Sequence, residues 1–150
     1  MSRLQLALNV SNLEESIEFY SKFFKTEPAK VRPGYANFAI TEPPLKLVLF
    51  ENREVPGTIN HLGVEVFSTN EVVDATRYLA GEGFATDIED GTVCCHALQD
   101  KVWVDGPDGS RWEVYTVLAD ASEPASLVGD ETRGSSGSLT TNPTRSAPCC

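Results

Sequence analysis

The sequence has no excess of basic residues and no long apolar run. Its 12 Lys and Arg stand against 22 Asp and Glu, which gives a formal net charge of -10. Nucleic acids and anionic membrane surfaces are bound by basic faces, so this charge argues against both classes of partner. No stretch is long enough to span a membrane. The apolar run nearest the start, residues 4–10, is short and interrupted by Gln5 and Asn9, so we see no signal peptide and expect a cytoplasmic protein.

Cysteine is also scarce, with four residues that form two adjacent pairs, Cys94-Cys95 and Cys149-Cys150. Cytoplasmic thiols are kept reduced, so the pairs are better explained as ligands for soft metals or metalloids, or as reactive thiols, than as a disulfide framework. Successive side chains of a regular strand face opposite sides. Cys94 and Cys95 therefore reach one atom together only if residues 90–96 leave regular strand structure, and Gly91 favours a loop there. The alternative is one buried and one exposed cysteine without a function.

The same strand pattern occurs twice in the chain. Residues 4–10 and 60–66 alternate apolar and other side chains, and they align without a gap, with Gln5 opposite His61. A helix follows each copy, capped at Ser11 or Asn12 in the first half and beginning at 68–70 in the second. Further strands are expected at 35–40 and 45–51, and then at 84–89, 97–104 and 111–117. This tandem repeat predicts modules of about 1–55 and 58–120 within one domain over residues 1–120.

The first helix and the end of the chain differ sharply in composition. Leu13, Ile17, Tyr20 and Phe24 recur at helical spacing, and Phe19 and Phe23 are expected to widen this apolar stripe. Residues 121–150 are rich in Ser, Thr, Gly and Pro and contain no aromatic residue. Such a segment cannot bury enough apolar surface to fold, so we expect a disordered tail.

Three polar residues are candidate metal ligands. Gln5 and His61 occupy equivalent places in the two repeats, and alternation puts Glu113 on the same side of the last strand as Tyr115 and Val117. A carboxylate on the side that faces a cupped sheet is costly to bury unless it is paired or binds a cation. One imidazole, one carboxylate and one amide oxygen would form an open three-ligand site, similar to the facial triad of non-haem Fe(II) oxygenases. From the residues alone, a polar strand end or a hydrogen-bonded core histidine is the alternative.

Other polar residues have weaker signals. His96 is the second of only two histidines; it is a candidate further ligand, or a group that lowers the pKa of a neighbouring thiol, and equally a solvent-exposed loop residue. Lys101, Asp105 and Arg111 are candidates to orient a small acid, although charges near a turn are usually solvated.

Several motifs carry a resemblance to a known family. The general match rests on the strand at 60–65 and on the turn and strand at 106–113, and the closer match on residues 33–40, 43–49, 92–95 and 99–104. In these motifs the chain resembles the vicinal oxygen chelate superfamily, which includes glyoxalase I, bleomycin-resistance proteins and extradiol dioxygenases. It is most similar there to the organoarsenical carbon–arsenic lyases and the cadmium-induced protein. The resemblance covers about residues 1–120.

The resemblance implies an α+β fold in which two tandem βαβββ modules form a cupped mixed sheet around one metal ion. It also implies Fe(II)- and O2-dependent cleavage of the carbon–arsenic bond in trivalent organoarsenicals such as methylarsenite and reduced aromatic arsenicals. Carried onto this chain, the metal ligands are Gln5, His61 and Glu113, and the arsenic-binding thiols are Cys94 and Cys95. The oxidised carbon fragment expected from a methyl group is formaldehyde.

Two other functions use the same residues. A sequestration protein would hold Cd(II) or As(III) on the thiols without any reaction. Another member of the superfamily, such as a glyoxalase-like isomerase, an antibiotic-binding module or another metalloenzyme, is the second alternative. Glyoxalase-type sites usually need four protein ligands, and the strand at 45–50 has no His or Glu to provide the fourth. The sequence leaves open whether the two modules of one chain close the cup or exchange with those of a second chain in a homodimer.

Overall fold

The computed structural model describes residues 2–94 and 96–121. Cys95 and the tail at 122–150, which we predict to be disordered, lie outside the described residues. The described elements, in chain order, are β1 (Arg3–Val10), α1 (Leu13–Phe24), β2 (Lys30–Arg32), β3 (Tyr35–Ile40), β4 (Leu45–Glu51), β5 (Ile59–Glu65), α2 (Thr69–Gly81), β6 (Asp87–Cys94), β7 (Ala97–Asp105) and β8 (Arg111–Asp120). Neither helix in this part of the chain combines the length and the apolar composition needed to cross a membrane.

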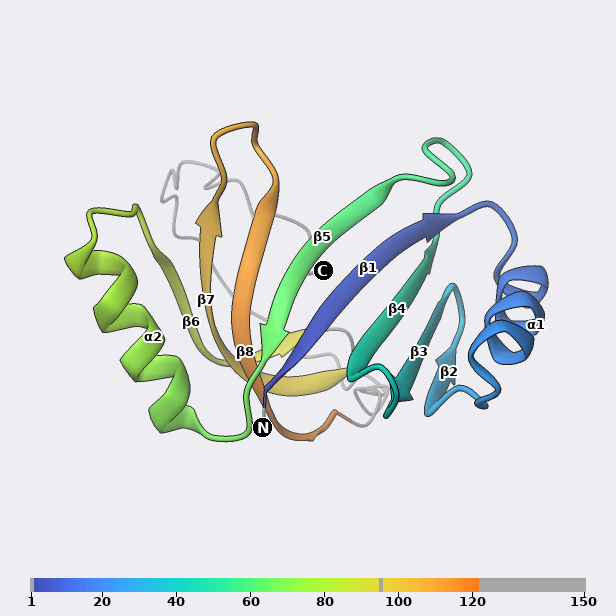
Figure 1. Cartoon of the computed structure of the whole chain (residues 1–150), viewed down its shortest axis with the longest axis horizontal. Coiled ribbons are helices and arrows are strands. Elements are labelled where there is room, and N and C mark those ends of the chain that lie inside the picture. The colour runs from blue at the N-terminus through green and yellow to red at the C-terminus, as the bar shows by residue number, and fades with distance from the viewer. Residues whose placement is uncertain (1, 95, 122–150) are drawn as a thin grey trace, which may run out of the picture.

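The described strands form one mixed sheet that confirms the predicted repeat. Its order is β2-β3-β4-β1-β5-β8-β7-β6, so each half has the same order read outward from the centre. β1 is parallel to β4 and β5 is parallel to β8, while β1 and β5 pair antiparallel and join the halves. Figure 1 shows β1 and β5 in the middle of the molecule with the helices on its two flanks. In this single-chain structure, the two modules form the cupped sheet together.

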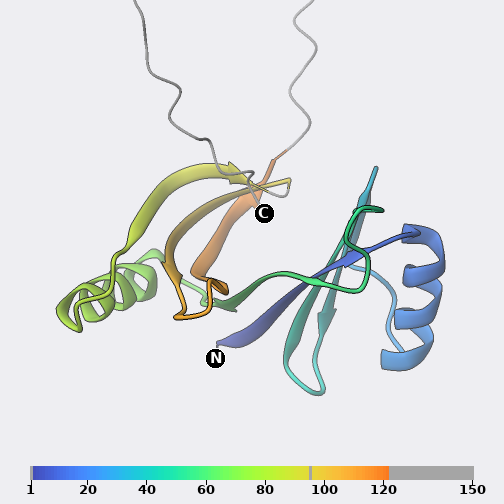
Figure 2. The ribbon, with the colours of Figure 1, turned by 90° about the horizontal axis from the view of Figure 1, so that it is seen from above.

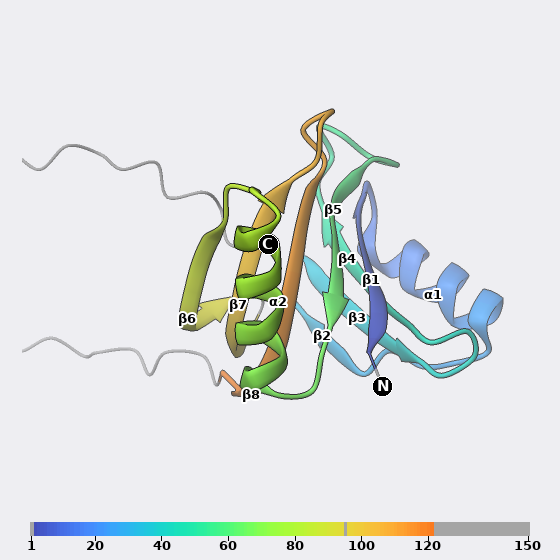
Figure 3. The same ribbon diagram turned by 60° about the vertical axis from the view of Figure 1, so that its left-hand side comes forward.

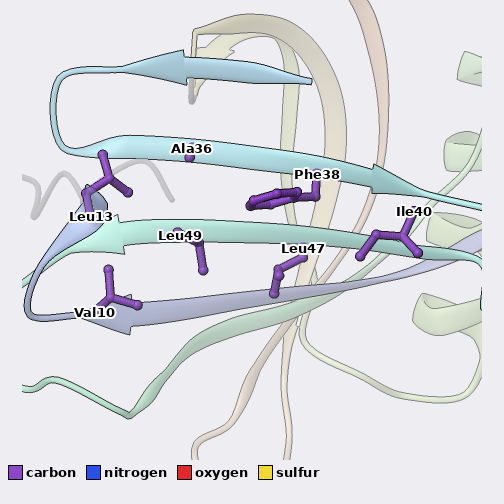
Figure 4. Close-up of a cluster of buried hydrophobic side chains, with 7 residues drawn as sticks. All are labelled: Val10, Leu13, Ala36, Phe38, Ile40, Leu47 and Leu49. Carbon is purple, nitrogen blue, oxygen red and sulfur yellow. The ribbon is translucent and has the colours of Figure 1, made fainter. Parts of the chain in front are cut away.

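The helices pack on the outer face of the curved sheet, as the view from above shows (Figure 2). Asn12 caps α1 by accepting a hydrogen bond from the Glu15 N–H, and Ser68 caps α2 in the same way. α2 lies along β7 and β8 (Figure 3). The buried cluster of the first half lies between α1 and β1, β3 and β4 and consists of Val10, Leu13, Ala36, Phe38, Ile40, Leu47 and Leu49 (Figure 4). The main apolar clusters of both halves face the helices, and the opposite face of the sheet carries buried polar residues such as Gln5, His61 and Glu113 together with apolar ones such as Val48.

Part of the predicted apolar stripe on α1 is wrong. Ile17, Tyr20 and Phe24 pack against the core, but Phe19 and Phe23 are 58% and 66% exposed. These two rings lie outside the part of the helix surface that faces the core, and they stack on each other with centroids 5.9 Å apart. Helical spacing of aromatic residues therefore does not place all of them in the core: Phe19 and Phe23 contact each other on the exposed side of α1.

The strand boundaries of the second half also differ from expectation. The strand expected at 84–89 runs instead over Asp87–Cys94, because backbone pairing with β7 continues up to the pair Cys94–Ala97. The short β2 strand was not predicted, since its three residues are too few to show a period. The strands expected at 35–40 and 45–51 are confirmed.

Candidate metal centre

The sheet brings Gln5, His61 and Glu113 together on its inner face. Gln5 lies opposite Gly63 across the β1–β5 junction, and Gly63 in turn pairs with Glu113 on β8. His61 Nε2 lies 3.3 Å from Glu113 Oε1. The Gln5 amide nitrogen lies 3.0 Å from His61 Nε2 and 2.7 Å from Glu113 Oε1. All three side chains are buried, with at most 5% exposure.

A chain of hydrogen bonds sets the orientation of the His61 ring. Asn9 donates from Nδ2 to Thr58 Oγ1, and Asn60 donates from Nδ2 to Asn9 Oδ1. Asn60 Oδ1 is thereby left to accept, and it lies 2.8 Å from His61 Nδ1. The proton of the neutral ring is accordingly assigned to Nδ1, which leaves a lone pair on Nε2 directed at Gln5 and Glu113. A histidine held through Nδ1 in this way is the usual arrangement of a metal ligand.

The Gln5 side chain shows how a cation would fit. Its NH2 group supplies hydrogens to both His61 Nε2 and Glu113 Oε1, so the lone pairs of these two atoms converge on one point. A rotation of the terminal amide exchanges its nitrogen for its oxygen. The three side chains then present one nitrogen and two oxygen acceptors, which is a donor set that suits a divalent metal.

Glu113 is held in its ionised form by Lys101. Lys101 is fully buried, and its Nζ donates to Glu113 Oε2 over 2.9 Å. Burial acts to raise the pKa of this carboxyl group, but the His61 ring, in the form that carries a proton on Nε2, and the Lys101 ammonium outweigh it, so the pKa of Glu113 lies below its usual value. Oε2 is thus taken by Lys101, and Oε1 is turned toward His61.

The two halves of the repeat differ at the position of the carboxylate. Ala7 pairs with Val48 on β4 as Gly63 pairs with Glu113 on β8. The residue of the first half that corresponds to Glu113 is therefore Val48, which is buried and apolar. The described residues contain no group of three His, Cys, Asp or Glu side chains that could hold a metal; beside His61 and Glu113, the amide of Gln5 is the candidate for a third ligand.

The candidate ligands line a cavity of about 160 Å³ between the two halves of the sheet. Its walls come from both modules and consist of Gln5, Ala29, Lys30, Tyr35, Asn37, Lys46, Val48, His61, Ala97, Gln99, Glu113, Tyr115, Val117 and Asp120. The predicted placement of Glu113, Tyr115 and Val117 on one side of the last strand is confirmed. A small molecule in this cavity would contact the candidate metal ligands directly.

The cysteine hairpin lies beside this cavity. Cys94 ends β6 and pairs with Ala97, a residue of the cavity wall, and its carbonyl accepts a hydrogen bond from Gln99 Nε2 over 3.4 Å. The loop expected over residues 90–96 is wrong for most of its length, because β6 continues to Cys94. The irregularity is a register shift at Gly91, whose φ is +58°. Cys94 is 2% exposed and disulfide-bonded rather than reduced as expected.

The remaining polar candidates take different positions. The His96 ring lies 5.3 Å from the ring of Tyr35, and its carbonyl accepts from Lys30. The guanidinium carbon of Arg111 lies 4.4 Å from the centroid of the Trp103 ring, and neither residue lines the cavity. Sequence reasoning did not anticipate the contact of Lys101 with Glu113, because it depends on the register of β7 against β8.

Three comparisons with known proteins bear on this site. Residues 3–114 match the model of the Glyoxalase/Bleomycin resistance protein/Dioxygenase superfamily. The cadmium-induced protein CadI of Mycobacterium tuberculosis (strain ATCC 25618 / H37Rv) is 64% identical over 121 residues, which cover 81% of this chain and 80% of that protein. A trivalent organoarsenical cleaving enzyme of Thermomonospora curvata is 62% identical over 122 residues, which cover 81% of each.

Solved structures match at lower identity. Homoprotocatechuate 2,3-dioxygenase from Arthrobacter globiformis aligns with a TM-score of 0.59 and 20% identity, over 79% of this chain and 36% of that one. Methylmalonyl-CoA epimerase from Mycobacterium tuberculosis aligns with a TM-score of 0.55 and 15% identity, over 76% and 86%. At these identities the likeness shows the fold alone.

Proposed function

Because the chain belongs to the Glyoxalase/Bleomycin resistance protein/Dioxygenase superfamily, we propose that it is an Fe(II)- and O2-dependent enzyme that cleaves the carbon–arsenic bond of trivalent organoarsenicals. Gln5, His61 and Glu113 hold the metal in this proposal. Cys94 and Cys95 bind the arsenic. The relative from Thermomonospora curvata, at 62% identity, is named for this cleavage, which supports the assignment of the substrate class.

The observation that carries the proposal is the convergence of His61 Nε2 and Glu113 Oε1 on the amide of Gln5. Three buried groups with an imidazole nitrogen, a carboxylate oxygen and an amide oxygen form an open ligand set of the kind that non-haem Fe(II) oxygenases use. With Val48 in place of a fourth ligand, positions on the metal stay available to O2 and substrate. A sequestration protein has no need of such an open site.

The residues of the chain have separate tasks in the reaction. The thiolates of Cys94 and Cys95 bind As(III), a soft thiophilic centre, and hold its organic group in the cavity. Since Cys94 is disulfide-bonded in the structure, its reduction precedes substrate binding. Lys101 keeps Glu113 ionised. The series of hydrogen bonds that runs from Asn60 through Asn9 to Thr58 keeps the Nε2 lone pair of His61 directed at the metal position. The Fe(II) held there supplies the oxidation of the bond by O2.

The overall reaction balances without a further reductant. Methylarsenite, CH3As(OH)2, and one O2 give arsenite, As(OH)3, and formaldehyde, HCHO. Both oxygen atoms of O2 enter the products, the carbon is oxidised, and arsenic stays trivalent. A pentavalent arsenical is a poor substrate, because it does not bind thiolates directly.

Arsenic speciation after a single incubation tests the proposal. The full chain is reduced, loaded with Fe(II) under anaerobic conditions and mixed with methylarsenite, with and without air. We expect arsenite and formaldehyde only when both Fe(II) and O2 are present. Arsenite without either of them contradicts the iron mechanism, and methylarsenite that is bound but unchanged favours sequestration of As(III) or Cd(II).

A matched pair of histidine variants adds a control on the metal. His61→Ala should lose Fe(II) binding and cleavage together, because it removes the only nitrogen ligand. His96→Ala should keep Fe(II) binding, since this residue contacts Tyr35 and not the three ligands. An active His61→Ala protein without metal would rule out the ligand set.

A further inference from the structure

The strand that ends at the cysteine pair contains a bulge of one residue. The pairing of β6 with β7 shifts by one between Glu89 and Thr92, so residues 90 and 91 lie opposite the single residue Asp100. Gly91 has a φ of +58°, a left-handed conformation that is costly for residues with a Cβ atom. A bulge leaves one residue of the strand outside the regular backbone ladder, so its backbone groups need other partners.

The bulge determines which face of the sheet Cys94 occupies. Side chains that lie directly opposite each other in an antiparallel pair share a face. Cys94 lies opposite Ala97, which lines the cavity. If β6 kept the register that it has up to Glu89, Val93 would lie opposite Ala97 and Cys94 would lie beyond the end of the pairing. The shift therefore brings Cys94 to the cavity face, where it is 2% exposed, while Val93 is 62% exposed.

The carboxylate of Asp100 holds this bulge. The Gly91 N–H donates to Asp100 Oδ1 over 2.8 Å, and Thr69 Oγ1, at the first residue of α2, donates to Asp100 Oδ2 over 2.6 Å. Asp100 is 7% exposed, and a buried carboxylate is costly unless its oxygens accept hydrogen bonds. Because β6 is an edge strand with one neighbour, this contact ties the bulge to the helix behind the sheet.

We propose that Asp100 is a positioning residue for the Cys94 thiol: by accepting from the Gly91 N–H, it stabilises the register that turns Cys94 toward the cavity. Successive side chains of β7 alternate between faces, so Asp100 lies on the face opposite to Gln99 and Lys101 and is absent from the cavity lining. It acts through the backbone of β6. The use of Cys94 as an arsenic ligand rests on the proposed function, but the orientation of its side chain does not.

Alkylation of a chain with one cysteine tests the position of the thiol. Cys95, Cys149 and Cys150 are replaced by serine, and the reaction of the reduced, folded protein with iodoacetamide is timed. We expect slow alkylation of the buried Cys94 in this background. Asp100→Leu removes a hydrogen bond to a charged group, so alkylation should become at least about tenfold faster. Equal rates with and without Asp100→Leu overturn the inference.

Two matched variants separate the contact with the bulge from the contact with α2. Asp100→Asn keeps an oxygen that accepts from the Gly91 N–H, and its amide can donate to Thr69 Oγ1. Thr69→Val removes only the contact with α2. Both should alkylate within about threefold of the single-cysteine background. An increase in Thr69→Val as large as that in Asp100→Leu would show that the helix contact matters and would contradict the proposal.

Deletion of Asp90 separates positioning from general stability. The deletion leaves one residue opposite Asp100, so β6 pairs regularly and Cys94 still lies opposite Ala97, with no bulge to hold. Asp100→Leu combined with this deletion should therefore return the alkylation rate to within about threefold of the background. A residue that only stabilised α2 or the core would not be rescued, so fast alkylation in the combined variant overturns the inference.

Gly91→Ala keeps the proposal testable if Asp100→Leu fails to fold. Gly91 is exposed, and a Cβ there meets no atom within 4 Å, so alanine acts only through the positive φ. It should raise the alkylation rate in the single-cysteine chain by about tenfold. An unchanged rate in a folded Gly91→Ala protein would show that the bulge does not control the thiol.

Capture of methylarsenite connects the position of the thiol with the proposed function. Equilibrium dialysis of the reduced full chain, with all four cysteines, should show at least about tenfold weaker capture in Asp100→Leu and Fe(II) affinity within about threefold of the wild type. Wild-type capture in Asp100→Leu overturns the positioning role and leaves the proposed function intact. The predicted alkylation rates in a chain that captures no methylarsenite uphold the positioning role and refute the proposed function.

Discussion

Substitution of Gly63 by alanine is expected to damage the candidate metal centre without touching a ligand. Gly63 pairs with Glu113 on one side and with Gln5 on the other. A Cβ atom at this position would lie 2.9 Å from Glu113 Cγ, 3.2 Å from the Glu113 carbonyl oxygen and 3.5 Å from Gln5 Cβ. The corresponding residue in the first half is Ala7, which faces the smaller Val48. Glycine at 63 therefore makes room for the longer side chain of Glu113.

The size of the effect follows from these distances. Carbon atoms in contact settle about 3.5–4.0 Å apart, so the Glu113 side chain has to move by roughly 0.5–1 Å. Ligands need to be held within about 0.5 Å of their working geometry, and an error near 1 Å can cost about 100-fold in rate. Overpacking of a buried site costs about 1–3 kcal/mol in the free energy of unfolding. We expect Gly63→Ala to bind Fe(II) at least about tenfold more weakly while it still folds.

The assay is a titration of Fe(II) into the reduced, metal-free protein, with the melting temperature measured on the same samples. Gly81→Ala is the matched control, because a Cβ there meets no atom within 4 Å and the residue lies at the end of α2. Helix propensity favours the change from glycine to alanine by up to about 1 kcal/mol, so the stability of this control should not fall. Its Fe(II) affinity should equal that of the wild type. Wild-type Fe(II) affinity in a folded Gly63→Ala protein would refute the assignment of Glu113 as a ligand.

Four further changes test other parts of the site. Cys94→Ser should abolish capture of trivalent arsenicals, measured by equilibrium dialysis, and leave Fe(II) affinity within about threefold; equal loss of both would refute the separation of tasks. Lys101→Met removes the positive charge that helps keep the pKa of Glu113 low, so the carboxylate of the variant becomes protonated at a higher pH. As the pH is lowered, the variant should therefore lose Fe(II) binding at a higher pH than the wild type does. An unchanged pH profile would contradict this role of Lys101. Val48→Glu offers a fourth ligand, so Fe(II) affinity should rise and cleavage should fall, and undiminished turnover would argue against an open three-ligand site. Truncation after Ala121 should change the melting temperature by no more than about 2 °C, and a large drop would show that the tail is part of the fold.

The sequence was sufficient to predict the repeat and the three candidate ligands, because both depend on local alternation. Gln5 and His61 stand out as polar residues in matching strands, and Glu113 shares its side with Tyr115, so each can be placed from its own segment. Lys101 could not be placed in this way. Its contact with Glu113 depends on the register of β7 against β8, which no local pattern encodes.

The predicted loop around Gly91 was wrong for a similar reason. Residues 90–94 have weak patterning because β6 lies at the edge of the sheet, where few side chains are buried and the apolar alternation fades. Backbone pairing with β7 holds the strand regardless of that pattern. Edge strands are therefore the elements that periodicity identifies least well, and this edge leads directly into Cys94.

The two-fold repeat also explains why the candidate metal centre has three rather than four possible protein ligands. A symmetric pair of modules turns four equivalent positions toward the cavity, two on β1 and β5 and two on β4 and β8. Polar residues with ligand atoms occupy three of them, Gln5, His61 and Glu113, and Val48 occupies the fourth. The fold alone would permit a closed site with four ligands. In the proposed function, the open site therefore depends on the one position of the four that lacks a ligand atom, Val48, which corresponds to Glu113 in the other half.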